Sequence, residues 1–275
     1  MISAICRATS REVQIVCSTG IACDVFKELS CFHLKPTTVH SVFGIGTEQA
    51  PFNCLVSKAV ANPAVRRRVQ EVDCVVWDEC SMSSARQSKL FHTIAQGIRN
   101  SKKPFGGIQT IIVGDWLQLK PVADRFDDGI AMFKSPLFRY VVPHTVRLSV
   151  LKRLNLGEDA FQNVLSELRN GRCSAATAQW VCDNLQRAVT GQTVHLHFTN
   201  ILVDGHNAIA LASQPGKNST FTAVDTGKTH GLKCHAPEKA VFKPGVPVVC
   251  LYNINDKLHN GTRATFVCKI DEKRR

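Results

Sequence analysis

Three short apolar runs in the first half of the chain share one design, because polar residues follow each of them at once. Residues 13–17 (VQIVC) lead into STG, residues 72–77 (VDCVVW) into DECS, and residues 110–113 (TIIV) into GDWLQ. Runs of this length, rich in valine and isoleucine, are typical of strands in a buried parallel sheet. We therefore predict three parallel strands whose polar ends meet at one edge, where such sheets bind ligands.

A helix is predicted between the second and third runs. The apolar side chains there recur at helical spacing, namely Leu90, Phe91, Ile94, Ala95 and Ile98. Ser84 followed by Gln87 offers a capping box for its start. Alternating strands and helices predict an α/β domain with right-handed crossovers.

A second section begins near Val146. An amphipathic helix is predicted around residues 161–168, stopped by Asn170 and Gly171. Residues 193–198 (TVHLHF) and 247–251 (PVVCL) read as strands, and a tight turn is expected at residues 260–261. The polar stretch 214–237 is expected to be rich in loops.

The chain is strongly basic: lysine and arginine number 34 and acidic residues 22, which leaves a formal charge of +12. A globular protein of this charge commonly binds nucleic acid, although a basic surface that only aids solubility explains the composition equally well. At 44% hydrophobic residues the composition is that of a globular domain, neither disordered nor membrane-embedded.

Twelve cysteines occur without any C-x-x-C, and several lie inside apolar runs. This usage indicates reduced, buried thiols and hence an intracellular protein. His230, Cys234 and His235 form a cluster, but no fourth ligand follows at the spacing of a zinc site. No run is long enough to span a bilayer.

Two of the strand ends carry candidate chemistry for nucleotide hydrolysis. A carboxylate such as Asp78 at a strand end suits Mg²⁺, and the neighbouring Glu79 can accept a proton from an attacking water. The alternative is an acidic pair that only complements a helix N-terminus. Gln118 follows the next strand in a Gly-Asp-x-x-Gln turn, where its amide could face a γ-phosphate or orient water; a plain polar turn is the alternative.

Several segments together resemble the Pif family of superfamily-one DNA helicases. They are CSTGIA at 17–22, TVHSVFGIG at 38–46, VVWDECSM at 75–82, PFGGIQTIIVGDWLQLKPV at 104–122, LSVLKRLN at 148–155, FQNVLSELRNG at 161–171 and GVPVVCLYNINDKLHNGTRATFV at 245–267. The resemblance runs nearly from end to end of the chain.

This resemblance implies roles for four residues of an ATPase site. Asp78 would bind magnesium, Glu79 would activate water, and Gln118 would sense the γ-phosphate. Arg153 would act as an arginine finger from a second domain. The family has Phe-Arg-Gln where this chain has Lys-Arg-Leu at 152–154, so the flanking residues that direct the arginine differ.

The resemblance also implies a track for single-stranded DNA. Thr19, Gly20, His40 and Ser41 would lie along it, since hydroxyl, imidazole and backbone donors suit phosphate contacts without base readout. Taken alone, His40 reads as a structural histidine. The basic clusters at residues 66–68 and 102–103 are interpreted as solvated faces.

The phosphate-binding motif G-x-x-x-x-G-K-[ST] is absent from the 275 residues. Residues 226–229 (TGKT) carry its last triplet, but Thr222 stands where the first glycine belongs. By resemblance, residues 1–8 would end the helix that follows the loop, and the family's last motif is missing too. We therefore expect both ends to be cut, and expect no ATPase activity from this exact chain.

The fold implied is α/β, with RecA-like parallel-sheet domains. Residues 1–145 would form a first motor domain without its P-loop strand, and residues 146–275 part of a second, with the start of a small β-barrel insert near 240–275. The implied function is an ATP-dependent, five-prime to three-prime DNA helicase of repair, recombination or telomere maintenance. It would use ATP and Mg²⁺, act on single-stranded and forked DNA as a monomer away from membranes, and reside in the nucleus or the mitochondrion. Alternatives are a truncated remnant that only binds single-stranded DNA, and a P-loop ATPase with no DNA role.

Overall fold

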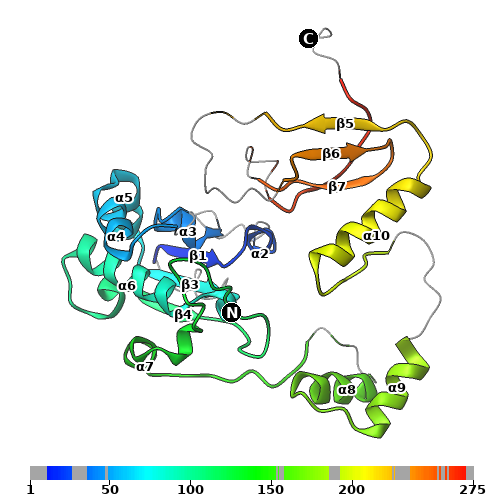
Figure 1. The fold of residues 1–275 in the computed structure, drawn as a ribbon. Helices are drawn as coiled ribbons and strands as arrows, with labels where there is room; N and C mark the ends of the chain where they lie inside the picture. Colours follow the sequence, from blue (N-terminus) through cyan, green and yellow to red (C-terminus); the bar gives the residue numbers. More distant parts are fainter. Residues whose placement is uncertain are drawn as a thin grey trace. The chain divides into compact units, whose positions relative to one another are not determined.

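A computed structural model describes residues 11–26, 36–46, 49–152, 154, 158–185, 193–224, 226, 236–252, 254, 258 and 260–270. The chain divides into two compact units, residues 1–187 and residues 188–275. Figure 1 shows the parallel sheet in the first unit and the antiparallel strands in the second.

The first unit is built on a four-stranded parallel sheet with the order β2-β1-β3-β4. Its strands are β1 (Val13–Cys17), β2 (Thr37–Thr38), β3 (Cys74–Asp78) and β4 (Gln109–Ile112). The three predicted strands are confirmed with small shifts, since β3 begins two residues later than the apolar run and extends to the carboxylate of Asp78.

Both faces of this sheet are buried, as the continuous apolar runs predict. Val16, Val75 and Trp77 point into the larger core, which the helices on that side cover. Ile15 and Val76 point to the opposite face, where a smaller cluster forms. Because side chains alternate along a strand, one register fixes which residues enter each core.

Short helices link and cover the strands: α2 (Gly20–Asp24), α3 (Val39–Val42), α4 (Phe52–Ala61), α5 (Pro63–Glu71), α6 (Ala85–Arg99) and α7 (Pro136–Val141). Three 3₁₀ turns add η1 (Cys80–Met82), η2 (Pro104–Gly107) and η3 (Met132–Lys134). The predicted helix is α6, and its Ser84 cap is confirmed: Ser84 Oγ accepts from the Gln87 backbone N–H at 3.0 Å.

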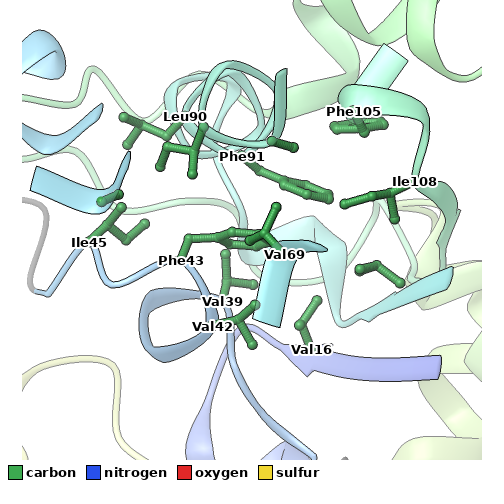
Figure 2. Packing of buried hydrophobic residues seen from close by; sticks show 14 of the residues in the cluster. Val16, Val39, Val42, Phe43, Ile45, Val69, Leu90, Phe91, Phe105 and Ile108 are labelled. Atoms are coloured by element: carbon green, nitrogen blue, oxygen red, sulfur yellow. The ribbon is translucent and has the colours of Figure 1, made fainter. Parts of the chain in front are cut away.

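An aromatic stack fills the core beneath α6 (Figure 2). The ring of Phe91 lies 4.2 Å from that of Phe43 and 4.6 Å from that of Phe105, with both pairs stacked. Trp77 of β3 packs against the same ring at 5.8 Å. The stack therefore joins α6 to the central strand and fixes the place of the loop that follows it.

Two further helices belong to the first unit, α8 (Asp159–Arg169) and α9 (Ala175–Leu185). The helix predicted around residues 161–168 is confirmed as α8, and it ends before Gly171, whose φ of 69° favours glycine. Phe161 and Trp180 stack at 5.4 Å between the two helices.

The second unit holds α10 (Asn200–Ser213) and two antiparallel strand pairs. β5 (Ser219–Thr222) pairs with β6 (Lys239–Phe242), and β7 (Pro247–Val249) pairs with β8 (Arg263–Thr265). The predicted strand at 247–251 and the turn at residues 260–261 are confirmed.

Two expectations for this unit fail in part. Residues 193–198 alternate as a strand does, yet they are exposed and form no strand, because no described neighbour pairs with their backbone. The stretch 214–237, expected to be loops, contains β5. Among the described residues, no helix combines the length and apolar character that spanning a membrane requires.

Candidate nucleotide and nucleic-acid site

Polar residues follow all four strands at the same edge of the sheet. Cys17, the last residue of β1, pairs with Asp78 on β3 and with Thr38 on β2. Trp77 pairs with Ile112 on β4. The strand order therefore sets the two groups of candidates side by side, with those for nucleic acid beyond β2 and β1 and those for the nucleotide beyond β3 and β4.

Asp78 and Glu79 occupy the exit of β3, and both are half-buried. Glu79 adopts a left-handed backbone conformation, with φ 53° and ψ 41°. This conformation costs a non-glycine residue about 1–2 kcal/mol. Such strain persists only where the surroundings hold it, and it often marks a functional position.

The donor set at this exit fits magnesium. Asp78 and Glu79 supply hard carboxylate oxygens. Cys80 follows them, and burial raises the pKa of its thiol to about 12, which favours the neutral thiol. No group of three or more His, Cys, Asp or Glu gathers as a metal site among the described residues. A magnesium ion here would therefore be coordinated by one or two carboxylates of the protein, and water and phosphate oxygens would supply its other ligands.

Gly114 lies where the turn after β3 packs against the turn after β4. The Cys80 backbone N–H donates to the Val113 carbonyl at 3.1 Å, which brings the turn after β3 against the turn after β4. A Cβ atom on Gly114 would lie 2.6 Å from Cys80 Sγ and 3.0 Å from Cys80 N. Only glycine allows this approach, so the spacing of the two turns depends on it.

The turn that carries Gln118 is organised by Asp115. Its carboxylate accepts from the Leu117 backbone N–H at 3.1 Å, and Gln118 Nε2 approaches it at 3.4 Å. Arg169 of α8 holds the same carboxylate through Nη2 at 2.6 Å and Nε at 3.1 Å. Chiefly through these bonds, Arg169 lowers the pKa of Asp115 to about 2. Gln118 itself is exposed at this edge.

Ser18 connects the end of β1 to the turn after β3. Its hydroxyl donates to the Glu79 carbonyl at 2.7 Å and lies 3.0 Å from the Ser83 hydroxyl. Ser83 in turn accepts from the Trp77 indole N–H at 3.2 Å. The sequence pattern placed Ser18 in the polar group after β1 without a role and did not mark Ser83, since a serine in a turn carries no signal of its distant partners.

Thr19 and Gly20 begin α2 directly beyond β1. Thr19 caps this helix, because its Oγ1 accepts from the Ala22 backbone N–H at 3.3 Å. Its hydroxyl proton stays available to donate in another direction. Both residues are half-buried at the sheet edge.

His40 and Ser41 lie on α3, directly beyond β2. His40 Nε2 is 3.2 Å from Gln87 Nε2, so the imidazole is oriented by the first turn of α6. Arg68 of α5 donates through Nη2 to the carbonyls of Ser41 at 3.0 Å and Val42 at 3.2 Å. The interpretation of Arg68 as part of a solvated basic face is therefore wrong: this side chain anchors α3.

The remaining candidates include residues that the structure does not describe. Arg153 lies outside the described residues, as do His230, Cys234 and His235. Arg67 keeps the exposed position expected of it, with its side chain 78% accessible and 3.9 Å from Glu71. The roles of Ser18, Arg68 and Arg169 at this edge follow from their hydrogen-bond partners, which the sequence pattern does not indicate.

A sequence model of the PIF1-like helicase family matches residues 1–179. The chain belongs to the PIF1-like helicase family. This match covers the sheet, the strand exits, α8 and the first part of α9. It confirms the family that the motifs of the chain resemble.

Individual PIF1 relatives match over most of the chain. An ATP-dependent DNA helicase PIF1 from Emericella nidulans is 30% identical over 274 residues, which are 95% of this chain and 35% of the relative. The chain thus spans about a third of that relative's length.

Solved PIF1 structures share the fold. The Pif1 helicase crystal structure from Candida albicans has a TM-score of 0.79 and 27% identity, over 99% of this chain and 62% of the other. A Bacteroides Pif1 in complex with ADP-AlF3 and ssDNA has a TM-score of 0.73 and 20% identity, over 98% of this chain and 63% of that one. The RecA-like α/β architecture is confirmed by these likenesses.

Proposed function

We propose that this chain is part of an ATP-dependent DNA helicase, in which it supplies the magnesium- and water-facing half of the ATPase site and part of the single-strand track. One observation carries the proposal: the sheet order β2-β1-β3-β4 sets Thr19, His40, Asp78 and Gln118 along a single edge. Family membership supports it, since its relatives are named ATP-dependent DNA helicases.

In the proposed ATPase site, each residue has one task. Asp78 would hold Mg²⁺, which when bound supplies positive charge to the phosphate oxygens. Glu79 would take the proton of the attacking water. Gln118, presented by the turn that Asp115 and Arg169 hold, would face the γ-phosphate. Arg153 would add a second positive charge to the transferring phosphate.

In the proposed track, the backbone of single-stranded DNA would pass over the exits of β1 and β2. Thr19 and Ser41 carry hydroxyl donors, Gly20 leaves room for close approach, and His40 is oriented by Gln87. The formal charge of +12 favours such a polyanionic partner. We propose single-stranded and forked DNA as substrates and ATP as the fuel.

The polarity, cellular role and location of the helicase belong to the same proposal. We propose five-prime to three-prime translocation by a monomer, in DNA repair, recombination or telomere maintenance, within the nucleus or mitochondrion. We also propose that the motor domains divide at 145/146, so that α8 and α9 belong to the second domain although they join the first compact unit.

A chimera tests the ATPase half of this proposal. A strand–loop–helix segment with the sequence G-x-x-x-x-G-K-[ST], taken from a relative that contains one, would precede residue 11. We expect DNA-stimulated ATP hydrolysis, and expect Asp78→Asn to lower it by at least about 100-fold, because a metal-binding charge contributes several kcal/mol. Glu71→Gln changes an exposed carboxylate of α5 and should leave the rate unchanged. Equal rates for the two variants would refute the role of Asp78.

The second candidate function is binding of single-stranded DNA without hydrolysis. It is favoured by the absence of G-x-x-x-x-G-K-[ST] from the 275 residues, since that loop supplies the amide cradle and the lysine for the phosphates. The 275-residue chain should then bind a labelled oligothymidylate with an affinity that falls as salt rises, and hydrolyse no ATP. Hydrolysis stimulated by DNA in this chain alone would exclude this second candidate.

A further inference from the structure

A continuous hydrogen-bonded relay runs from the core to the backbone of Glu79. Ser18 has one hydroxyl proton and gives it to the Glu79 carbonyl, at 2.7 Å. The 3.0 Å contact between the two hydroxyls must therefore be a donation from Ser83 to Ser18. Ser83 accepts from the indole N–H of Trp77. Each proton in the relay Trp77, Ser83, Ser18, Glu79 thus has one direction only.

The relay ends on a strained residue. The Glu79 carbonyl accepts from the Met82 backbone N–H at 3.3 Å as well as from Ser18. These two bonds hold Glu79 in its left-handed conformation, which in turn sets the direction in which its side chain leaves the strand. Loss of the Ser18 bond would remove one of the two restraints on the carbonyl.

On its C-terminal side, Ser18 is followed by Thr19, the first residue of the proposed DNA track. Ser18 stands between Cys17, which pairs with Asp78, and Thr19, which caps α2. Since Ser18 and Thr19 share one planar peptide unit, Ser18 links the cap of α2 to the turn after β3 along a short path. Ser18 is therefore joined to Thr19 through its peptide bond and to the Glu79 carbonyl through its hydroxyl.

We propose that Ser18 is a positioning residue that transmits contact with single-stranded DNA at Thr19 and Gly20 to the backbone of Glu79. The inference rests on the proposed function, because it needs DNA at the exit of β1. It adds a physical route by which an occupied track would reorient the residue that activates water. Trp77 lies at the far end of the relay, fully buried, and reports on its state.

The indole N–H resonances of the ¹⁵N-labelled chain test this proposal. The chain has three tryptophans, and Trp116→Phe and Trp180→Phe assign the Trp77 signal. Saturating oligothymidylate should shift the Trp77 resonance in the unaltered chain. In Ser18→Ala, DNA should still bind, as fluorescence anisotropy would measure, but the Trp77 shift should be lost. An unchanged Trp77 shift in Ser18→Ala would overturn the inference.

Two more variants separate a relay from a merely structural serine. Ser83→Ala cuts the relay between Trp77 and Ser18, so it should also abolish the shift even if Ser18→Ala fails to fold. Ser81→Ala removes a hydroxyl from the same turn that is 3% exposed and has no hydrogen-bond partner among the described residues. Ser81→Ala should keep the full response. Loss of the response in Ser81→Ala would indicate a general disturbance of the turn and refute the relay.

Failure of the inference and failure of the proposed function give different results. If the unaltered chain binds no oligothymidylate, the proposed DNA track is wrong and the relay falls with it. If the chain binds DNA while the Trp77 resonance stays in place, the proposed function stands and only the relay is wrong.

Discussion

The guanidinium of Arg169 holds the carboxylate of Asp115 across 54 residues of sequence, with bonds of 2.6 and 3.1 Å. Asp115 in turn organises the loop that presents Gln118. A helix outside the parallel sheet thereby controls the turn after β4. The pair is partly exposed, so its effect should appear in the ionisation of Asp115 more than in global stability.

The pH dependence of this pair follows from the direction in which the pKa of Asp115 is shifted. The pKa of Asp115 is lowered to about 2 from an ordinary value of 3.8, so the folded protein favours the ionised form. Its contribution to stability is complete above pH 3.8 and is lost as the pH falls through about 2. Arg169→Gln should move the pKa of Asp115 upward toward its ordinary value, as a ¹³C carboxyl titration would measure. Arg139→Gln, on α7, is the control; equal pKa values in the two variants would contradict the pairing.

Gly114 provides a test of the packing between the two turns. Gly114→Ala would place a methyl group 2.6 Å from Cys80 Sγ, so either the turns separate or the strands shift. We expect a loss of about 1–3 kcal/mol in the free energy of unfolding, the usual cost of overpacking, measured by urea denaturation with tryptophan fluorescence. Gly97→Ala in α6 has a nearest contact of 3.4 Å and should not destabilise the protein. Equal effects at both positions would refute this close packing.

Glu79 should show a conflict between stability and function. Glu79→Gly has two opposing effects on the free energy of unfolding. It removes the left-handed strain, worth about 1–2 kcal/mol, and it adds the entropy cost of ordering a glycine, about 0.5–1 kcal/mol. The expected result is equal or higher stability, by up to about 1 kcal/mol, together with loss of ATP hydrolysis in the chimera. Glu79→Gln keeps the strain and should lose hydrolysis without any gain. A clear destabilisation by Glu79→Gly would show that its side chain is needed for folding.

Arg68 should affect DNA affinity without touching DNA. Arg68→Lys loses the guanidinium Nη2 that holds the carbonyls of Ser41 and Val42, at about 0.5–1.5 kcal/mol per bond, so affinity for oligothymidylate should fall by roughly 5- to 150-fold if both bonds are lost. The slope of log affinity against log salt should stay unchanged, because no phosphate contact is removed. Arg67→Lys, on the exposed side of the same helix, should change neither quantity. A reduced slope in Arg68→Lys would place Arg68 on the DNA itself.

Local sequence determined the elements that carry the chemistry. The apolar runs before Ser18, Asp78 and Gly114 predict β1, β3 and β4, because burial on both faces of a parallel strand demands such residues. The spacing from Leu90 to Ile98 likewise predicts α6. Since parallel strands share one ligand-binding edge, the same runs also predict that their polar ends converge.

Only the tertiary structure decided which hydrogen bonds form between residues at that edge of the sheet. Ser18 finds the Glu79 carbonyl 61 residues away, Arg68 finds the Ser41 carbonyl 27 residues away, and neither pairing leaves a trace in the local pattern. The left-handed backbone of Glu79 likewise follows from the packing of its turn. The alternation at residues 193–198 failed to give a strand for the same reason. A periodic pattern reports which faces can be buried, whereas a hydrogen bond depends on which distant groups the fold brings within reach.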